Sequence, residues 1–265
     1  MRPAARSTRA RRSYGRPRLV TALARLLGRW RHRSAGNAVR GVASLLLAVG
    51  WSAPASAQVT GGVALESDYR LRGYSLSSGH PVVTADLGYD HASGLYLGAS
   101  AVTDLNRAAV IGLQGNIGYA RRLSPTLSID GGVVRSEYLS SFSGGRAAHY
   151  TELYLGLTRR SLSARAYYSP DYFRTGARTL YGEVEGVIHP AAQWRLNGHV
   201  GALTRLGALP LYTQRTSYDW RLGVTRQLGH FDVHAAVSGG GPGADYYAGR
   251  RRDRTALVVG AAWVF

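Results

Sequence analysis

The sequence predicts an all-β protein, a closed antiparallel transmembrane β-barrel of about 12 strands with short periplasmic turns and longer extracellular loops. Three observations predict this fold class. Apolar and polar residues alternate with a period of two through most of residues 58–265, short and long connections alternate between these segments, and the chain ends on an aromatic residue, Phe265. A period of two is typical of strands whose two faces differ. A sheet in lipid must close on itself, because lipid offers no partner for backbone hydrogen bonds.

The first 57 residues differ in composition from the rest of the chain. The net charge of +18 comes from 33 basic residues, all of them Arg, against 15 acids; residues 1–57 contain 12 of these Arg and no acid. Residues 58–265 therefore carry 33 − 12 = 21 Arg against 15 acids, a net charge of only +6. Because the leader accounts for most of the basicity, we expect no nucleic-acid partner for the remainder.

This leader has the pattern of a secretory signal peptide. Its basic region is followed by an apolar run over residues 41–50 and by Ala55-Ser-Ala57, which predicts cleavage after Ala57. The apolar run is too short to span a bilayer. The basic region is longer than a signal peptide needs, so we expect that the translation start is assigned too early. The predicted organisation is a basic leader and signal peptide over 1–57 and an outer-membrane β-barrel over 58–265.

The alternation divides the rest of the chain into twelve expected strands. In one of them, Leu180, Val184 and Ile188 share a face, and Tyr181 and Glu183 lie on the other. The first strand is expected to place Val63, Leu65, Ser67, Tyr69 and Leu71 on its apolar face. The expected strands lie near 60–72, 81–91, 95–103, 110–121, 126–137, 149–159, 162–172, 179–189, 194–203, 216–226, 231–239 and 254–265.

The connections between these strands are expected to sort by length. Short turns are predicted at 92–94, 122–125, 160–161, 190–193 and 227–230, and longer loops at 74–80, 104–109, 138–148, 173–178, 204–215 and 240–252. Short turns on one side and long loops on the other are typical of outer-membrane barrels. A soluble β-sandwich would not sort its turns in this way, and a lipocalin-like barrel would place the apolar faces inside and normally has fewer strands.

The last strand carries a separate signal. Leu257, Val259, Ala261, Trp263 and Phe265 share one face. A final strand with aromatic residues at its end resembles the signal by which the bacterial barrel-assembly machinery takes up outer-membrane proteins. We therefore expect Trp263 and Phe265 to form an assembly signal, with that machinery as a partner.

The first predicted hairpin contains a short motif formed by Ser67, Asp68, Tyr69, Arg72, Gly73 and Ser75, and the segments 79–82 and 89–98 follow it. These residues resemble the opening pattern of the TorF-type porin family of proteobacterial outer-membrane proteins. Segments 167–173 and 198–201 also look like later motifs of the family. The resemblance implies a small outer-membrane barrel with a transport role, and it implies neither catalytic residues nor a cofactor.

The polar faces of the strands are expected to line the barrel lumen. The charged and His residues assigned to this face are Glu66, Asp68, Arg70, Arg72, Asp86, Asp90, Asp130, Glu152, Arg165, Asp171, Glu183, Glu185, Arg195, His199, Asp219, Arg221, Asp232 and His234. The eleven acids outnumber the five Arg of this set, so a conducting lumen is expected to prefer cations. The alternative is that the acids pair with the lumen Arg and plug a non-conducting, structural or adhesive barrel.

The remaining Arg fall mostly in turns and loops. Arg250, Arg251, Arg252 and Arg254 cluster at the last long loop. Guanidinium groups bind phosphate groups bidentately, so outer-membrane lipid and lipopolysaccharide are expected partners, besides small solutes or ions.

Catalysis is not expected. Asp232, His234 and Ser238 alternate along one predicted strand, and this spacing does not place them in the geometry of a catalytic triad. An outer-membrane hydrolase is therefore the less favoured alternative. No cofactor and no metal site are predicted, and the absence of Cys excludes disulfides and thiolate ligands.

Overall fold

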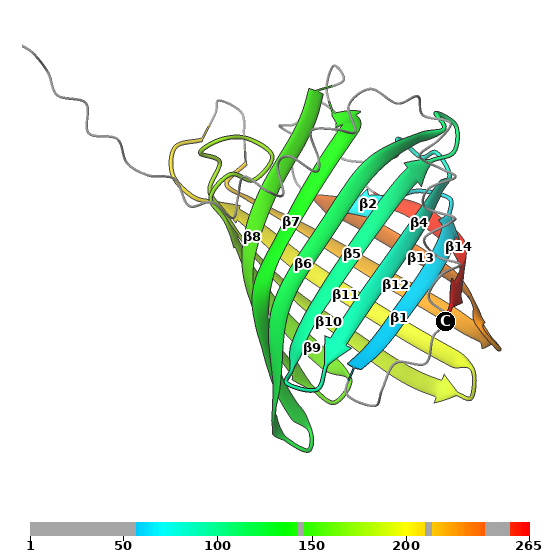
Figure 1. Ribbon diagram of the computed structural model, residues 1–265. Helices are drawn as coiled ribbons and strands as arrows, with labels where there is room; N and C mark the ends of the chain where they lie inside the picture. The colour runs from blue at the N-terminus through cyan, green and yellow to red at the C-terminus, as the bar shows by residue number, and fades with distance from the viewer. Residues whose placement is uncertain (1–56, 143–145, 210–213, 242–254) are drawn as a thin grey trace, which may run out of the picture. The chain divides into compact units, whose positions relative to one another are not determined.

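The computed structural model of the chain describes residues 57–142, 146–209, 214–241 and 255–265 (Figure 1). The chain divides into two units, 1–51 and 52–265, and the described residues belong to the second. The predicted leader lies outside the described residues apart from Ala57, and so does the Arg cluster at 250–254. Within the described ranges, no helix is long and apolar enough to cross a bilayer.

The described residues form fourteen strands. Their bounds are β1 Ala57–Glu66, β2 Arg70–Leu71, β3 Tyr74–Ser75, β4 Val82–His91, β5 Leu95–Asp104, β6 Ala109–Ser124, β7 Leu127–Phe142, β8 Arg146–Arg159, β9 Leu162–Ser169, β10 Thr179–Ala191, β11 Trp194–Arg205, β12 Thr216–Leu228, β13 Phe231–Gly241 and β14 Thr255–Val264. Twelve of them close into one antiparallel barrel in the order β1-β14-β13-β12-β11-β10-β9-β8-β7-β6-β5-β4, with β4 paired again to β1. The predicted fold class, a closed barrel of twelve antiparallel strands, is confirmed.

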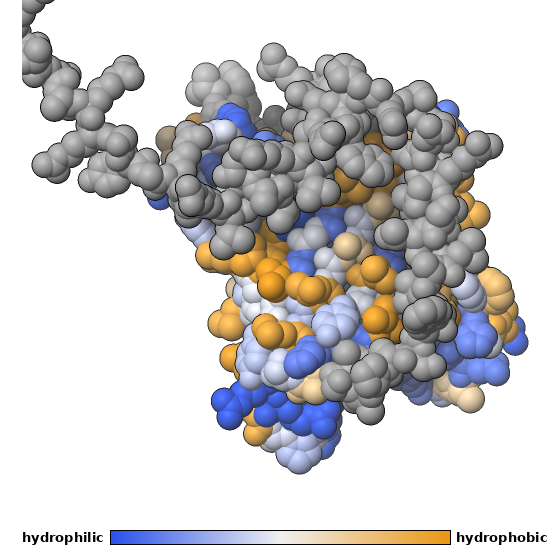
Figure 2. Space-filling model, viewed as in Figure 1, coloured by the Kyte–Doolittle hydropathy of each residue, from blue (hydrophilic) through white to orange (hydrophobic). Residues whose placement is uncertain are grey.

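The alternation along each strand turns apolar side chains outward. Leu222 and Leu257 are each 65% exposed, and Leu113, Val184 and Val259 also lie on the outer face, whereas Tyr181, beside the outward-facing Leu180, is 1% exposed. The antiparallel register aligns these faces in neighbouring strands, as in the pair Val184 and Val200. Figure 2 shows apolar residues over the middle of the barrel wall and hydrophilic residues at its lower end.

The connections lie at two ends of the barrel. One end, which we call the turn end, carries the connections at 92–94, 125–126, 160–161, 192–193 and 229–230. The other, the loop end, carries the connections 67–81 between β1 and β4, 105–108 between β5 and β6, and 170–178 between β9 and β10. β7 and β8 continue to Phe142 and Arg146, so most of the loop predicted at 138–148 is paired strand instead.

Two predicted strands are shorter than expected at the loop end. The first was expected to reach residue 72, but β1 ends at Glu66, and the chain turns inward after Ser67 bonds to Val259 of β14. Tyr69 and Leu71 therefore do not face outward; both pack against a cluster of buried Tyr side chains. The strand expected over 162–172 ends at Ser169, because Pro170 has no backbone N–H with which to continue the ladder.

The C-terminal residue closes the seam between β1 and β14. Phe265 and Gly61 exchange two backbone hydrogen bonds of 3.0 Å. The Phe265 ring lies over Gly61, where a Cβ atom would stand 2.6 Å from it. The C terminus is accordingly seen beside β1 and β14 in Figure 1. The terminal aromatic residue therefore has a structural place in the closed barrel.

Candidate functional site

A cavity of about 870 Å³ lies within the barrel and is lined mainly by polar and charged side chains. Most of the residues that the sequence assigns to the lumen line it. They are Glu66, Asp68, Arg70, Arg72, Asp90, Asp130, Glu152, Arg165, Glu183, Glu185, His199, Asp219, Arg221 and His234. Arg70 and Arg72 reach it from the inserted segment 67–81 and not from the barrel wall, which corrects the expected position of both on the first strand.

Four of the assigned residues do not line this cavity. Arg195 of β11 and Asp232 of β13 form an ion pair with each other. Asp86 lies on β4 opposite Gly62. Asp171 is a correction: it lies in the connection between β9 and β10, is exposed, and accepts a hydrogen bond of 2.8 Å from the backbone N–H of Gly176.

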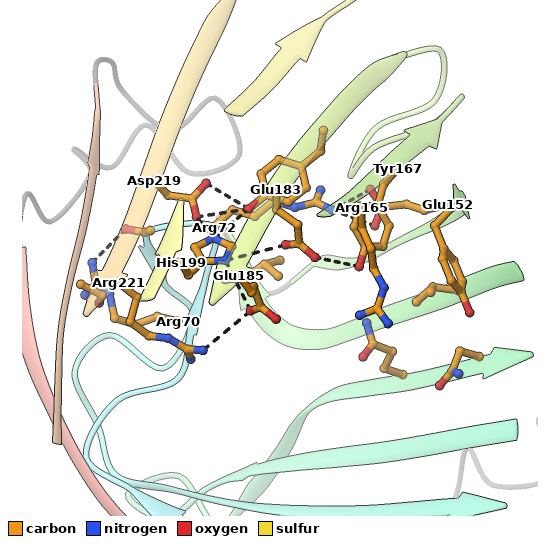
Figure 3. Close-up of a pocket in the computed structure, with 18 of the residues that line it drawn as sticks. Arg70, Arg72, Glu152, Arg165, Tyr167, Glu183, Glu185, His199, Asp219 and Arg221 are labelled. Carbon is orange, nitrogen blue, oxygen red and sulfur yellow. Dashed lines mark hydrogen bonds and ion pairs between the residues drawn. The ribbon is translucent and has the colours of Figure 1, made fainter. Parts of the chain in front are cut away.

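One side of the cavity carries a network centred on His199. Glu185 and Arg221 lie beside His199 in the register of β10, β11 and β12. His199 Nε2 lies 2.8 Å from Asp219 Oδ1, and its Nδ1 lies 3.4 Å from Glu185 Oε1 (Figure 3). The Tyr181 hydroxyl donates to Asp219 at 3.2 Å. Three neighbouring strands thus bring acid, imidazole and phenol groups together on one wall.

This arrangement depends on Gly201, which stands beside Glu183 of β10 and Asp219 of β12 in the register. A Cβ atom at Gly201 would overlap the Tyr181 hydroxyl. The missing side chain leaves the path along which Tyr181 crosses β11 to reach Asp219.

A second group lies on β5, β7, β8 and β9. Arg165 Nη2 lies 3.3 Å from Asp130 Oδ2. The hydroxyls of Tyr96 and Tyr154 are hydrogen-bonded to each other, and that of Tyr96 also donates to Asp130 at 3.3 Å. Asp130 therefore has both a cationic and a phenolic partner.

Among the described residues, acids outnumber Arg along the cavity. Its lining contains eight acids and four Arg, a formal charge of 4 − 8 = −4 with both His neutral. Each of the four Arg lies within 4 Å of one lining acid: Arg70 of Asp68, Arg72 of Glu152, Arg165 of Asp130 and Arg221 of Glu185. The lumen therefore contains both the acid excess and the ion pairs that the sequence suggested.

Segment 67–81 folds into the lumen and contains the hairpin of β2 and β3. Its centre is Asp68, which accepts hydrogen bonds from Ser75 Oγ, from Ser77 Oγ at 2.8 Å and from the Gly79 N–H at 3.2 Å. Arg70 Nη1 donates to the same carboxylate at 3.0 Å. The short polar side chains that suggested a family motif in the sequence thus build this inserted hairpin.

The tip of the hairpin places Arg72 in a box made of Glu152 and three Tyr rings. Arg72 Nη2 donates to both oxygens of Glu152 at 2.9 Å. Its guanidinium carbon lies 3.9 Å from the centroid of the Tyr181 ring, 5.0 Å from that of Tyr172 and 5.6 Å from that of Tyr167. Burial raises the pKa of Tyr172 well above its ordinary value, so this ring stays neutral and offers its face to the cation.

An aromatic cluster surrounds the box at the loop end. Tyr138 and Tyr150 pack with rings 6.1 Å apart, and Phe173 lies 4.7 Å from Tyr150. This cluster is not among the features predicted from the sequence. The available signal was the excess of Tyr, 17 against 4 Phe, together with an Arg-Gly pair at 72–73, where the first expected strand ends.

Two of the three residues of the hydrolase alternative are paired with residues outside this set. His234 Nε2 lies 3.4 Å from Glu66 Oε1, and Asp232 is paired with Arg195. Ser238 Oγ is buried and has no hydrogen-bond partner in the described part of the chain. The three side chains form no charge-relay arrangement.

Solved structures similar to this chain include outer-membrane porins. The NanC porin matches with a TM-score of 0.50 and 11% identity over 76% of this chain and 98% of that one. The KdgM porin matches with a TM-score of 0.49 and 12% identity, over 78% and 99% of the two chains. The outer-membrane channel DcaP of Acinetobacter baumannii matches with a TM-score of 0.40 and 10% identity, over 82% and 99%. At these identities, the likeness to NanC shows a shared barrel fold.

The sequence comparisons identify a family without an assigned activity. No curated protein matches the chain. The TorF-type resemblance stays a prediction, whereas its coarser part, a bacterial family with a porin-like barrel, agrees with the family match and with the fold. The chain belongs to the family described as "Bacterial protein of unknown function (Gcw_chp)", whose model matches residues 51–264.

Proposed function

We propose that this protein is an outer-membrane channel for the passive diffusion of small solutes or ions, and that it prefers cations. The observation that carries the proposal is the combination of a closed barrel with an apolar outer face and a lumen in which acids outnumber Arg. An apolar outer face can contact lipid, and a lumen with an excess of acids can attract hydrated cations.

The outer face supports a membrane location. Large apolar side chains such as Leu155, Leu222 and Leu257 are more than half exposed and recur around the wall. Soluble proteins rarely leave continuous apolar surface of this extent in water. A bilayer covers such a surface and leaves the polar lumen hydrated, which is the arrangement of outer-membrane barrels. The predicted signal peptide provides the route across the inner membrane.

The charge of the cavity supports cation preference. The formal −4 of the lining lies between walls of low dielectric constant, where a fixed charge acts over a longer range than in water. Glu183, Glu185 and Asp219 are gathered on adjacent strands, so the negative potential is expected to be strongest along the wall that contains His199.

The proposed partners of the barrel are lipopolysaccharide and the barrel-assembly machinery. Exposed Arg at the loop end, among them Arg178 and Arg215, suit the phosphate groups of lipopolysaccharide. Trp263 and Phe265 suit recognition of the last strand by the barrel-assembly machinery.

The test is conductance of the purified protein in planar lipid bilayers. In a KCl gradient, we expect discrete conductance steps and a reversal potential on the cation side. The variant Glu183→Gln/Glu185→Gln should move the reversal potential towards zero, because it removes two carboxylates with little change in volume. Anion preference of the unmodified protein would contradict the proposed selectivity.

The plugged barrel is the second candidate, and the inserted hairpin favours it. Segment 67–81 and the aromatic cluster occupy the loop end of the lumen. A folded, membrane-inserted protein without any conductance would favour this structural or adhesive barrel over the channel.

A further inference from the structure

The inserted hairpin crosses the barrel from one wall to the opposite one. It leaves the wall at β1, and in the closed ring β9 stands six strands from β1 in either direction. Arg72, at the tip of the hairpin, contacts Glu152 of β8, Tyr167 of β9 and Tyr181 of β10. Figure 3 shows Arg72 between the hairpin and these strands. The tip is therefore bound to the wall directly opposite its origin.

The backbone of the tip is a tight turn that orients Arg72 towards this wall. Arg72 and Gly73 both have positive φ, 47° and 80°. Two successive residues of positive φ are the mark of the two-residue hairpin turn that favours Asn or Gly. An Arg at the first position is disfavoured by its own backbone, and the contacts of its side chain offset this cost.

Both ends of the inserted segment are attached to the barrel independently of Arg72. Ser67 bonds to the backbone of Val259 at one end. At the other end, His80 Nδ1 lies 3.3 Å from Asp104 Oδ2. Between these attachments, Asp68 holds the segment together through bonds internal to it. Residues 68–79 can therefore be treated as one preformed unit that is fixed at its ends.

The contacts of this unit with the far wall are of two kinds. Leu71, Tyr74 and Leu76 pack against the aromatic cluster, and Arg72 is the cation in the box. Glu152 is buried, so without Arg72 its carboxylate would lose the cation that compensates its burial. The bonds between Arg72 and Glu152 therefore fix the tip against the far wall, and without them only the apolar contacts would hold it there.

We propose that the hairpin of β2 and β3 is a gate across the lumen, and that a guanidinium bound between Glu152 and the Tyr172 and Tyr181 rings holds it in the narrow position. Arg72 is the tethered guanidinium of this site, and small guanidinium or amine compounds are the class of ligand that the box accepts. The inference rests on the proposed channel function, since a gate presupposes a passage.

The experiment is a comparison of variants in planar bilayers, with ethylguanidinium as the probe. Arg72→Ala keeps the backbone preference of a non-Gly residue and removes the guanidinium. We expect a several-fold larger single-channel conductance than in the unmodified protein. Ethylguanidinium at millimolar concentration should return the conductance towards the original value, because the vacated box again contains a guanidinium. Glu152→Gln, which keeps the shape of the box, should also raise the conductance.

Two control variants separate the gate from simple pore block. Arg221→Ala removes one lumen Arg that lies 3.9 Å from Glu185 and has no part in the box. Its conductance should not fall on addition of ethylguanidinium, and neither should that of the double variant Arg72→Ala/Glu152→Gln. If ethylguanidinium lowers the conductance of all variants alike, or if Arg72→Ala conducts like the unmodified protein, the gate is contradicted and the channel stands.

A second measurement keeps the inference testable if no variant conducts, an outcome that would contradict the proposed function itself. The chain has no Cys, and Leu76 of the inserted segment is buried against the aromatic cluster of the far wall. A maleimide should label Leu76→Cys slowly in the otherwise unmodified protein and several-fold faster together with Arg72→Ala. Equal labelling rates would overturn the gate, whatever the conductance.

Discussion

At the scale of single residues, the position of a side chain on the pleat decides its surroundings. Leu222 and Arg221 are neighbours in the chain, but Leu222 faces outward and Arg221 lines the cavity. The same substitution therefore has different consequences at adjacent positions, and the outer face and the lumen can be tested one residue at a time.

The outward face is tested by a charge at its middle. We predict that Leu222→Arg destabilises the protein in lipid by about 2–4 kcal/mol, because the guanidinium enters the hydrocarbon region. Asn116→Arg, in the cavity lining, should cost clearly less. Urea-induced unfolding in vesicles measures both. A larger cost at Asn116 than at Leu222 would mean that the assigned faces are exchanged, as a register shift of one residue would do, and equal costs would contradict the assignment of the two residues to different faces.

The space at Gly201 is tested by adding one methyl group. Gly201→Ala should force Tyr181 away from Asp219, and we expect a loss of about 1–3 kcal/mol in the free energy of unfolding, as for other overpacked sites. Gly198→Ala, on the same strand, is the matched control because a Cβ atom there meets nothing within 4 Å. Denaturant titration measures the free energy of unfolding of both variants. An equally large loss for Gly198→Ala would show that strand flexibility, and not the Tyr181 contact, is responsible.

At the scale of elements, β14 pairs with β1 over fewer residues than β13 pairs with β12. The register of β1 with β14 runs from Gly62 to Glu66, whereas that of β12 with β13 runs from Tyr218 to Leu228. The two backbone bonds between Gly61 and Phe265 extend this short seam by one further pair. The terminal residue therefore contributes to closure of the barrel as well as to the predicted assembly signal.

Removal of Phe265 separates these two roles. We predict that deletion of this residue lowers the yield of folded barrel in cells more strongly than the yield of unassisted refolding into detergent, because the proposed assembly signal would act only in cells. Val264→Ala, at an exposed neighbouring position, serves as control. Heat-modifiable migration on gels measures the yield in both settings. Parallel losses in cells and in detergent would leave Phe265 with only its seam contact.

At the scale of the whole molecule, closure of the sheet leaves the apolar face outside and the charges inside. A barrel of this kind has backbone hydrogen bonds around its full ring. Such a protein needs a bilayer or detergent to cover its outer wall.

The whole-molecule prediction concerns location and processing. We expect a mature protein that begins at Gln58, is recovered in the outer-membrane fraction, and migrates differently on gels before and after heating. The closed hydrogen-bonded ring resists unfolding by detergent until it is heated. N-terminal sequencing and membrane fractionation check this, and recovery from the soluble periplasm would count against it.

Much of the wall could be predicted from the sequence, because a strand imposes its period of two locally. The faces of β10 and β12 follow from the residues of each strand alone, and so does the assignment of Glu183, Glu185 and Asp219 to the cavity. The first strand was predicted too long because Asp68, Arg70 and Arg72 continue the polar alternation of Glu66. The change from strand to inserted hairpin depends on hydrogen bonds of Asp68 with residues that follow the turn, and a local pattern does not contain them.

The sequence by itself determined the fold class, the number of barrel strands and the two faces of the wall, since these follow from pleat geometry and from the need to pair every strand in lipid. Only the tertiary structure decided what occupies the lumen. Arg72 and Glu152 are 80 positions apart, and they meet because closure of the ring places β8 to β10 across from β1. This contact depends on the diameter of the barrel, which is fixed only when all twelve strands have closed into a ring.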